Sequence, residues 1–343
     1  MIDINSIDEN YCFPKFNTQK IDITDYLLAG RNKIHFVQNT SSSTRDCYLS
    51  FYPLAKNIRF ISTHFFESII NNNRPILSNR CRPGEDSFWR SETGDSWFPW
   101  LWTRYFNNTS TNLESWLNIF ENIEDVVDQV DISKDISVSN FFLYLSCLEH
   151  TYRLNKKFSE YLVDNYLVDF PNGPICGLQI RRGEIVPKDG DLSKSWGLRP
   201  TYSVDNYMDG VSEICELLGT KNIFISTDSI ETVEYLESTY RDYKFYYNRY
   251  DRNKFIRYNG DPNVHLEVDL QSKPHLIQHY TESCLIDLYA LSKCHGYVGG
   301  MKHSEYGICG WFLQMINQSA ITPYFNVEGE FDLGNKNVGM LLR

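Results

Sequence analysis

The stretch "ICGLQIRRGEIVPKDGD", residues 175–191, decides the fold that we predict for the second half of this chain. An apolar run ends abruptly at two adjacent arginines, Arg181 and Arg182, and an acidic loop follows that begins at Glu184. A short apolar run with a turn signal behind it is typical of a buried strand in a parallel sheet. The stretch therefore predicts a strand over residues 175–180 that carries two cations at its carboxyl end.

The segments after this strand alternate between helical and strand patterns. Strands are predicted for "NIFIST" (222–227), "YKFYYN" (243–248) and "GYVGG" (296–300), and helices for residues 203–219, 228–240, 281–294 and 301–316. Asp228 is the predicted N-cap of the second helix, with Glu231 three residues later. Such alternation predicts an α/β fold with a doubly wound parallel sheet, in which ligands bind beyond the carboxyl ends of the strands.

The first half of the chain has a less regular pattern. We expect a strand at "NKIHFVQN" (32–39), a polar turn at "TSSSTRD" (40–46), and either a helix or a strand followed by a helix over 51–73. A strand at "RPILS" (74–78) and helices over 112–130 and 139–167 follow, and a bend in the last helix is compatible with the pattern. The tryptophan-rich segment 95–106 is either a buried aromatic cluster or a platform for a sugar. Proline and glycine in "DFPNGP" (169–174) indicate a boundary between an N-terminal α/β domain, residues 1–170, and a second domain, residues 171–343.

Charge and composition limit the classes of partner. The 343 residues include 33 Lys and Arg against 44 Asp and Glu, a net charge of −11, so a broad basic surface for nucleic acid is not expected. The nine cysteines form no C-x-x-C motif, which favours reduced core thiols over disulfides or a zinc site. The N-terminus lacks a signal-peptide pattern, and no apolar run reaches the roughly 20 residues of a membrane helix. We therefore expect a cytoplasmic protein without a membrane segment.

The two arginines suit an anionic ligand. Side chains alternate along a strand, so Arg181 and Arg182 point in different directions, and one can bind a phosphate while the other supports the loop. A guanidinium binds phosphate oxygens bidentately and keeps its charge. The alternative is that both arginines form surface salt bridges with Glu184, Asp189 or Asp191.

Four segments, in this order, resemble motifs of the α-1,6-fucosyltransferases, the family of the animal core fucosyltransferase and the nodulation-factor fucosyltransferase. They are "LQIRRGE" (178–184), "LRPTYSVDNYM" (198–208), "NIFISTDSIETVEYLESTYRDYKF" (222–245) and "YTESCLIDLYALSKCHGYVGGMKHSEYG" (280–307). The resemblance covers residues 152–314, and the first half matches only in general character. It implies a GT-B-like fold of two facing Rossmann-like domains. Residues 1–170 would face the acceptor, and residues 171–343 would bind the GDP-sugar.

The resemblance also implies a reaction and its partners. Fucose would pass from GDP-fucose to a hydroxyl of an oligosaccharide or glycan acceptor, with inversion, and with neither a metal nor another cofactor. The donor-binding residues implied by position are the β-phosphate ligand Arg181, its support Arg182, and Gln179, Tyr207, Asp228, Asp287, His303 and Ser304. Asp228 would order the loop after its strand, Asp287 would contact the nucleotide, and His303 or Ser304 would line the phosphate pocket. The alternatives are a plain helix cap at Asp228 and a solvated helix residue at Asp287.

The acceptor hydroxyl needs a base, and carboxylates are the natural candidates. Asp189 has the spacing of the family's glutamate base, and Glu184 and Asp191 are rivals. Arg181 and Glu184 join Asp189 as expected catalytic residues. The sequence departs from the motif where Gln179 replaces a histidine, Gly183-Glu184 replaces Thr-Asp, and Ile185 replaces a lysine. Two further functions stay open: a transferase that uses another GDP-sugar, and a non-catalytic glycan-binding relative.

Overall fold

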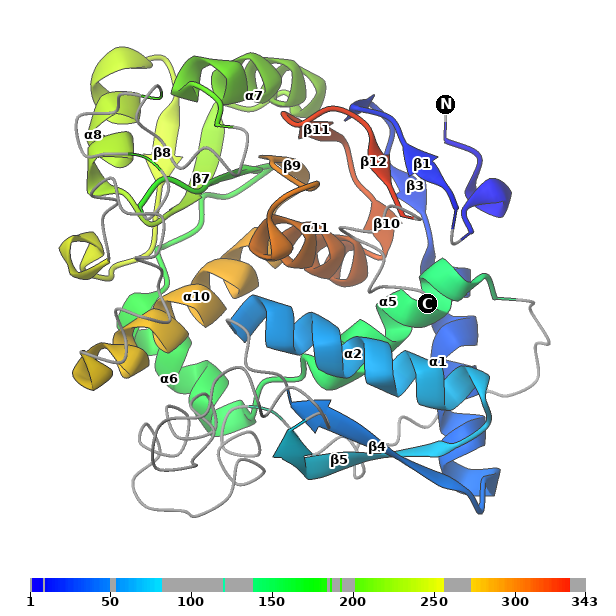
Figure 1. The fold of residues 1–343 in the computed structure, drawn as a ribbon. Helices are drawn as coiled ribbons and strands as arrows, with labels where there is room; N and C mark the ends of the chain where they lie inside the picture. Colours follow the sequence, from blue (N-terminus) through cyan, green and yellow to red (C-terminus); the bar gives the residue numbers. More distant parts are fainter. Residues whose placement is uncertain are drawn as a thin grey trace. The chain divides into compact units, whose positions relative to one another are not determined.

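A computed structural model describes residues 2–8, 10–49, 54–81, 120, 138–183, 186, 192, 201–255 and 273–333. The chain divides into two compact units (Figure 1). Unit 1 consists of Met1–Ile2, Cys12–Asp22 and Leu162–Asp332; unit 2 consists of Asp3–Tyr11, Ile23–Tyr161 and Leu333–Arg343. Each unit thus joins segments that are far apart in the sequence.

Unit 1 is built on a six-stranded sheet with the order β2-β11-β9-β6-β7-β8. The strands are β2 (Phe16–Asn17), β6 (Cys176–Ile180), β7 (Asn222–Thr227), β8 (Lys244–Tyr246), β9 (Gly296–Gly299) and β11 (Tyr324–Asn326). All neighbouring pairs are parallel except β2 and β11. The four strands predicted in the second half are confirmed, and the fold is mixed α/β with a mostly parallel sheet.

The helices of unit 1 follow the predicted alternation. They are α7 (Val204–Leu218), α8 (Ile230–Thr239), α10 (Ile277–Ser292) and α11 (Glu305–Gln318). A capping box of Ser203 and Asn206 begins α7, and Gly219, with φ of 62°, ends it. The predicted N-cap of α8 is wrong by one residue: the Ser229 hydroxyl caps this helix and accepts from Thr232 N, because the Asp228 carboxylate is engaged elsewhere.

The order of the strands reverses at β6. From β6 the chain continues to β7 and then β8 on one side, and it returns to β9 on the other side of β6. Such a reversal is the place where open α/β sheets bind ligands, beyond the carboxyl ends of the strands. The loops that follow β6 and β9 therefore flank the expected ligand position.

Residues 12–22 belong to this unit although they lie near the N-terminus. Besides β2, they form β1 (Cys12–Phe13), which pairs antiparallel with β12 (Phe331–Asp332), and β3 (Ile21–Asp22), which pairs antiparallel with β10 (Ala320–Ile321). The rings of Phe13, Trp311 and Tyr324 are buried together, with the Phe13 and Trp311 centroids 5.1 Å apart. The sequence pattern had predicted none of these short strands.

Unit 2 contains a 3₁₀ turn (Ile4–Ser6), the parallel pair β4 (Thr44–Leu49) and β5 (Arg74–Cys81), and the helices α1 (Thr24–Thr40), α2 (Leu54–Ile70) and α5 (Asn140–Thr151). The single helical stretch predicted over 139–167 is divided: the helix α6 (Lys156–Tyr166), which spans the boundary between the two units, follows α5 after a short break. The strand predicted at residues 32–39 is wrong, since they lie in α1, and the predicted polar turn extends into β4. The aromatic segment 95–106 lies outside the described residues, as does the predicted helix 112–130 apart from Phe120.

Side chains explain the helix at residues 32–39. Leu27, Ile34 and Val37 are buried at helical spacing, while Phe36 is 49% exposed. Gly30 allows α1 to lie close to α5, because a Cβ there would be 2.1 Å from Ser146 Oγ. No helix within the described ranges is long and apolar enough to cross a membrane.

Candidate functional site

Four loops meet at the carboxyl edge of the unit 1 sheet, and we call them together the strand-end site. They follow β6 (residues 181–183), β7 (228–229), β9 (300–304) and β11 (327–329). These strands are consecutive neighbours in the sheet. The site therefore collects most of the residues predicted to bind a donor.

Asp228 fixes the turn that carries the arginines. Its Oδ1 accepts the backbone N–H of Arg182 over 2.9 Å, and its Oδ2 accepts that of Gly183 over 2.8 Å. A carboxylate that accepts two backbone N–H groups sets the direction of the backbone. The structure thus assigns Asp228 to the loop after β6 and rules out the alternative of a plain helix cap.

Arg181 and Arg182, which follow the last residue of β6, have different surroundings. Arg181 is partly exposed, whereas Arg182 is only 8% exposed. Burial lowers the pKa of the Arg182 guanidinium, and the nearby Tyr207, Asp228 and Asp205 oppose this shift. An arginine pKa starts so high that the side chain keeps its charge. A buried cation of this kind favours an anionic partner.

Tyr207 connects two charged parts of the site. This residue of α7 is buried, and burial raises the pKa of its hydroxyl. The Glu328 charge raises this pKa further, and the Arg182 charge lowers it. The charges of Glu328 and Arg182 therefore both act on the Tyr207 hydroxyl.

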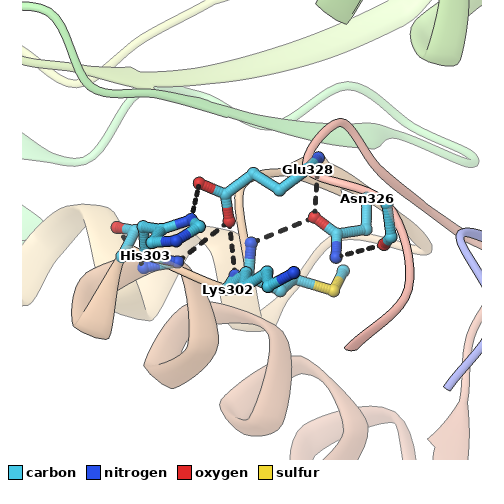
Figure 2. Close-up of polar contacts among 8 residues, drawn as sticks. Lys302, His303, Asn326 and Glu328 are labelled. Atoms are coloured by element: carbon cyan, nitrogen blue, oxygen red, sulfur yellow. Dashed lines mark hydrogen bonds and ion pairs between the residues drawn. The ribbon is translucent and has the colours of Figure 1, made fainter. Parts of the chain in front are cut away.

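The loop after β9 is held by Glu328 and Asn326, as Figure 2 shows. Glu328 Oε2 accepts the backbone N–H groups of Lys302 and of His303, the latter over 3.0 Å. Glu328 Oε1 lies 3.3 Å from His303 Nδ1. The buried Asn326 side chain accepts from Met301 N over 3.1 Å and from Glu328 N over 3.2 Å. Sequence analysis did not identify Glu328 or Asn326, although "NVEGE" directly follows an apolar run.

Ser304 and Gln179 lie where this loop meets α11. The Ser304 hydroxyl caps α11 and accepts from Gly307 N over 3.0 Å. Gln179 is 4% exposed, and a Cβ at Gly307 would come within 3.1 Å of its Oε1 and 2.0 Å of Gly300 O. Only glycine permits this approach, which places Gln179 beside the first turn of α11.

Asp287 lies in a separate buried cluster with Asn248, Tyr250 and Arg252, which we call the Asp287 cluster. Asn248 Nδ2 and Tyr250 Oη each donate to its carboxylate over 2.7 Å. Burial raises the pKa of this carboxyl, and Arg252 and the hydrogen bonds oppose the shift. Asp287 is 2% exposed, so the alternative of a solvated helix residue is wrong. A nucleotide would have to share or replace one of these bonds.

Arg252 is a further residue that sequence analysis did not identify. It is 3% exposed, donates to Thr227 O over 3.1 Å and to Asn248 O over 3.0 Å, and stacks on the Tyr250 ring at 4.1 Å. A lone arginine in a loop after a strand gives no sequence signal for such burial. Its contacts tie the ends of β7 and β8 together.

The predicted base lies outside the described residues. This holds for Asp189 and for its rivals Glu184 and Asp191. Within the described part of the chain, no group of three or more His, Cys, Asp or Glu side chains could hold a metal ion. The acidic motif "DGD", residues 189–191, lies outside the described residues.

Comparisons with known proteins give matches among solved structures. No family model matches the chain, and no curated protein matches it. Among solved structures, the crystal structure of NodZ α-1,6-fucosyltransferase soaked with GDP-fucose is 11% identical and covers 78% of this chain and 93% of that one, with a TM-score of 0.38. A similarity at this level supports no conclusion about the reaction of this chain.

Proposed function

We propose that this protein is a glycosyltransferase that transfers fucose from GDP-fucose to a hydroxyl of a glycan, with inversion and without a metal. The four motifs that resemble the α-1,6-fucosyltransferases support the donor. One structural observation carries the proposal: the Asp228 carboxylate holds the backbone of Arg182 and Gly183 at the point where the strand order reverses. A double arginine fixed at that point suits a diphosphate.

Charge development explains how the arginines would act. The bond between the anomeric carbon and the β-phosphate oxygen breaks as the acceptor oxygen attacks, and negative charge grows on the leaving GDP. Arg181 would contact this diphosphate directly, and the buried Arg182 would add its charge and hold the loop. Cations placed in advance stabilise the transition state more than the ground state, and this difference accelerates the reaction.

The remaining parts of the proposal concern the rest of the chain. The Rossmann-like GDP-sugar domain is unit 1, which contains most of residues 171–343. In this domain Tyr207, Gln179 and Ser304 line the donor site and Asp287 contacts the nucleotide. The acceptor domain of this GT-B-like fold is unit 2, which contains most of residues 1–170. Among the carboxylates, Asp189 is the candidate for the base that takes the proton of the acceptor hydroxyl, with Glu184 and Asp191 as rivals. The protein acts in the cytoplasm.

The direct test is a screen of donors and acceptors. The purified chain is incubated with GDP-fucose, GDP-mannose or GDP-glucose and with a panel of glycans, and GDP release and product masses are measured. The expected result is GDP release with GDP-fucose and the addition of one deoxyhexose to an acceptor. An Arg181→Ala protein prepared in the same way controls for contaminating transferases.

Two other outcomes would overturn the proposal. Transfer from a different GDP-sugar would replace fucose with that sugar. Oligosaccharide binding with all GDP-sugars left intact would instead identify a non-catalytic glycan-binding protein.

A further inference from the structure

The pair of His303 and Glu328 has the geometry of an oriented imidazole (Figure 2). His303 Nδ1 lies 3.3 Å from Glu328 Oε1, and the backbone N–H of the same histidine donates to Glu328 Oε2 over 3.0 Å. The carboxylate thus holds both the ring and the backbone of one residue. Two such contacts leave the ring little freedom to turn.

Glu328 is itself held in place and shielded from solvent. Its side chain is 7% exposed, and its backbone N–H donates to Asn326 Oδ1 over 3.2 Å. A Cβ at Gly300 would lie 3.0 Å from its Cδ, so the glycine makes room for the carboxyl group. The His303 side chain is 30% exposed. The carboxylate is therefore the buried member of the pair, and the imidazole is the member that a ligand can reach.

The contact decides which ring nitrogen can accept a proton. A carboxylate accepts hydrogen bonds, so Nδ1 carries the hydrogen that faces Glu328. In a neutral imidazole the lone pair then lies on Nε2. A carboxylate that holds Nδ1–H thus directs Nε2 away from itself, toward a ligand.

The pair lies in the strand-end site, not elsewhere in unit 1. His303 follows β9, the direct neighbour of β6, whose carboxyl end carries Arg181 and Arg182. The Tyr207 hydroxyl is within electrostatic range of both Glu328 and Arg182. His303 and the two arginines therefore belong to the same strand-end site.

We propose that His303 Nε2 is the base that accepts the proton of the acceptor hydroxyl, with Glu328 as its positioning residue. The inference rests on the proposed function and gives His303 a role other than lining the phosphate pocket. The acceptor oxygen forms a bond to the anomeric carbon, and the bond from that carbon to the β-phosphate oxygen breaks, with its electron pair leaving on GDP. The hydroxyl proton moves to His303 Nε2 and later passes to water.

The tautomer of His303 tests the pairing without any assay of activity. Nitrogen-15 NMR of the full chain distinguishes Nδ1–H from Nε2–H imidazole, and His303→Gln assigns the signal. The expected form in the wild type is Nδ1–H. In Glu328→Gln the amide oxygen can still accept the backbone N–H groups while the NH₂ faces Nδ1, so the ring should change to Nε2–H. An Nε2–H ring in the wild type would overturn the inference.

Kinetics test the role. Turnover of His303→Gln should fall on the order of 10²-fold or more, the typical contribution of a general base, while the Kd for GDP changes less than about threefold. Glu328→Gln should lose a similar factor, and Glu328→Asp, which keeps the carboxylate, should recover part of it. The exposed His275→Gln is the matched histidine control, and its turnover should equal that of the wild type.

The outcomes separate the inference from the function on which it rests. A wild type that transfers no sugar refutes the proposed function and the base with it. An active wild type with an equally active His303→Gln refutes the base alone. If His303→Gln does not fold, as judged by its thermal transition, Glu328→Gln decides: a changed tautomer with full turnover overturns the assignment.

Discussion

The carboxylate of Asp228 accepts the backbone N–H of Arg182 over 2.9 Å, although 46 residues separate the two in the sequence. The second oxygen accepts from Gly183 N, so one side chain at the end of β7 fixes the turn at the end of β6. Asp228 therefore positions the guanidinium of Arg182 through the backbone. Stability and ligand binding should depend together on this one carboxylate.

Asp228→Asn should weaken both properties. The amide keeps one acceptor, but its NH₂ faces a second N–H group, which loses its hydrogen bond. We expect the free energy of unfolding to fall by about 1–3 kcal/mol, the cost of an unsatisfied donor, and the affinity for GDP to fall with it. Urea unfolding and calorimetric titration with GDP measure the two effects.

Ser229→Ala is the matched control, since it removes the neighbouring cap of α8 and leaves the β6 turn in place. It should cost about 1 kcal/mol of stability and leave GDP affinity unchanged. Equal loss of GDP affinity in both variants would contradict the role given to Asp228.

Arg181→Ala should remove on the order of 3 kcal/mol of transition-state stabilisation, the range for one preorganised charge contact. Arg181→Lys should not restore it, because an ammonium cannot reproduce the two-pronged contact of a guanidinium with phosphate. The measurement is kcat/KM for the donor in both variants. Near-normal kcat/KM in the lysine variant would disprove a phosphate ligand at this position. Arg182→Ala should be severe partly through folding, because Arg182 is buried.

The parallel sheet of unit 1 could be predicted from the sequence because each strand there is a short apolar run followed by a helical stripe. This pattern does not predict side-chain contacts between residues that are far apart in the sequence. Asp228 and Ser229 are both good helix caps, and only the N–H groups of the distant β6 turn decide between them. Glu328 was not predicted as a site residue because the strand before it, β11, has only three residues, too few for a periodic pattern.

Residues 32–39 show a different limit. Isoleucine, phenylalanine and valine close together favour a strand by propensity, yet burial of Leu27, Ile34 and Val37 on one face favours the helix, and tertiary packing decides. Asp287 was predicted at the correct place on its helix. Its bonds to Asn248 and Tyr250 could not be predicted, because they join a helix to a loop about 40 residues away.

Transfer should persist in excess EDTA. The strand-end site offers guanidinium groups in the place where metal-dependent transferases use a cation, and these can neutralise the leaving diphosphate. The assay is fucose transfer before and after dialysis against EDTA. Loss of activity that manganese or magnesium restores would reject the metal-independent mechanism and make "DGD" the first candidate for a metal site.

Asp189→Asn tests the carboxylate that competes with His303 for the role of base. If Asp189 takes the proton, the variant should lose most of its turnover and keep its affinity for GDP, because an amide cannot accept a proton at neutral pH. Glu184→Gln is the matched control: a carboxylate that pairs with the arginines should affect donor binding as well as rate. Full turnover in Asp189→Asn together with a strong loss in His303→Gln would assign the base to His303.

Asp287 should make stability depend on pH. Its folded-state pKa lies above the ordinary value of 3.8, chiefly through burial, so the folded chain binds this proton more tightly than the unfolded chain does. The contribution of Asp287 to stability is therefore largest at low pH and declines as pH rises from about 4 through its folded-state pKa. Asp287→Asn should remove this decline, and the exposed Asp242→Asn should not. Urea unfolding of the three proteins at several pH values measures the difference.

The pairing of residues 12–22 with the last strands has a consequence for biosynthesis. Asn17 Nδ2 donates to Thr322 O, 305 residues further along, and β2 completes the sheet only by pairing with β11. When the ribosome has synthesised β6, β7 and β8, it has not yet synthesised β10, β11 and β12, the strands that pair with β3, β2 and β1. Residues 12–22 are therefore synthesised before β6, β7 and β8 but find their partners after them. Until then the growing chain exposes the apolar side chains of Phe13 and Phe16, which a chaperone could bind.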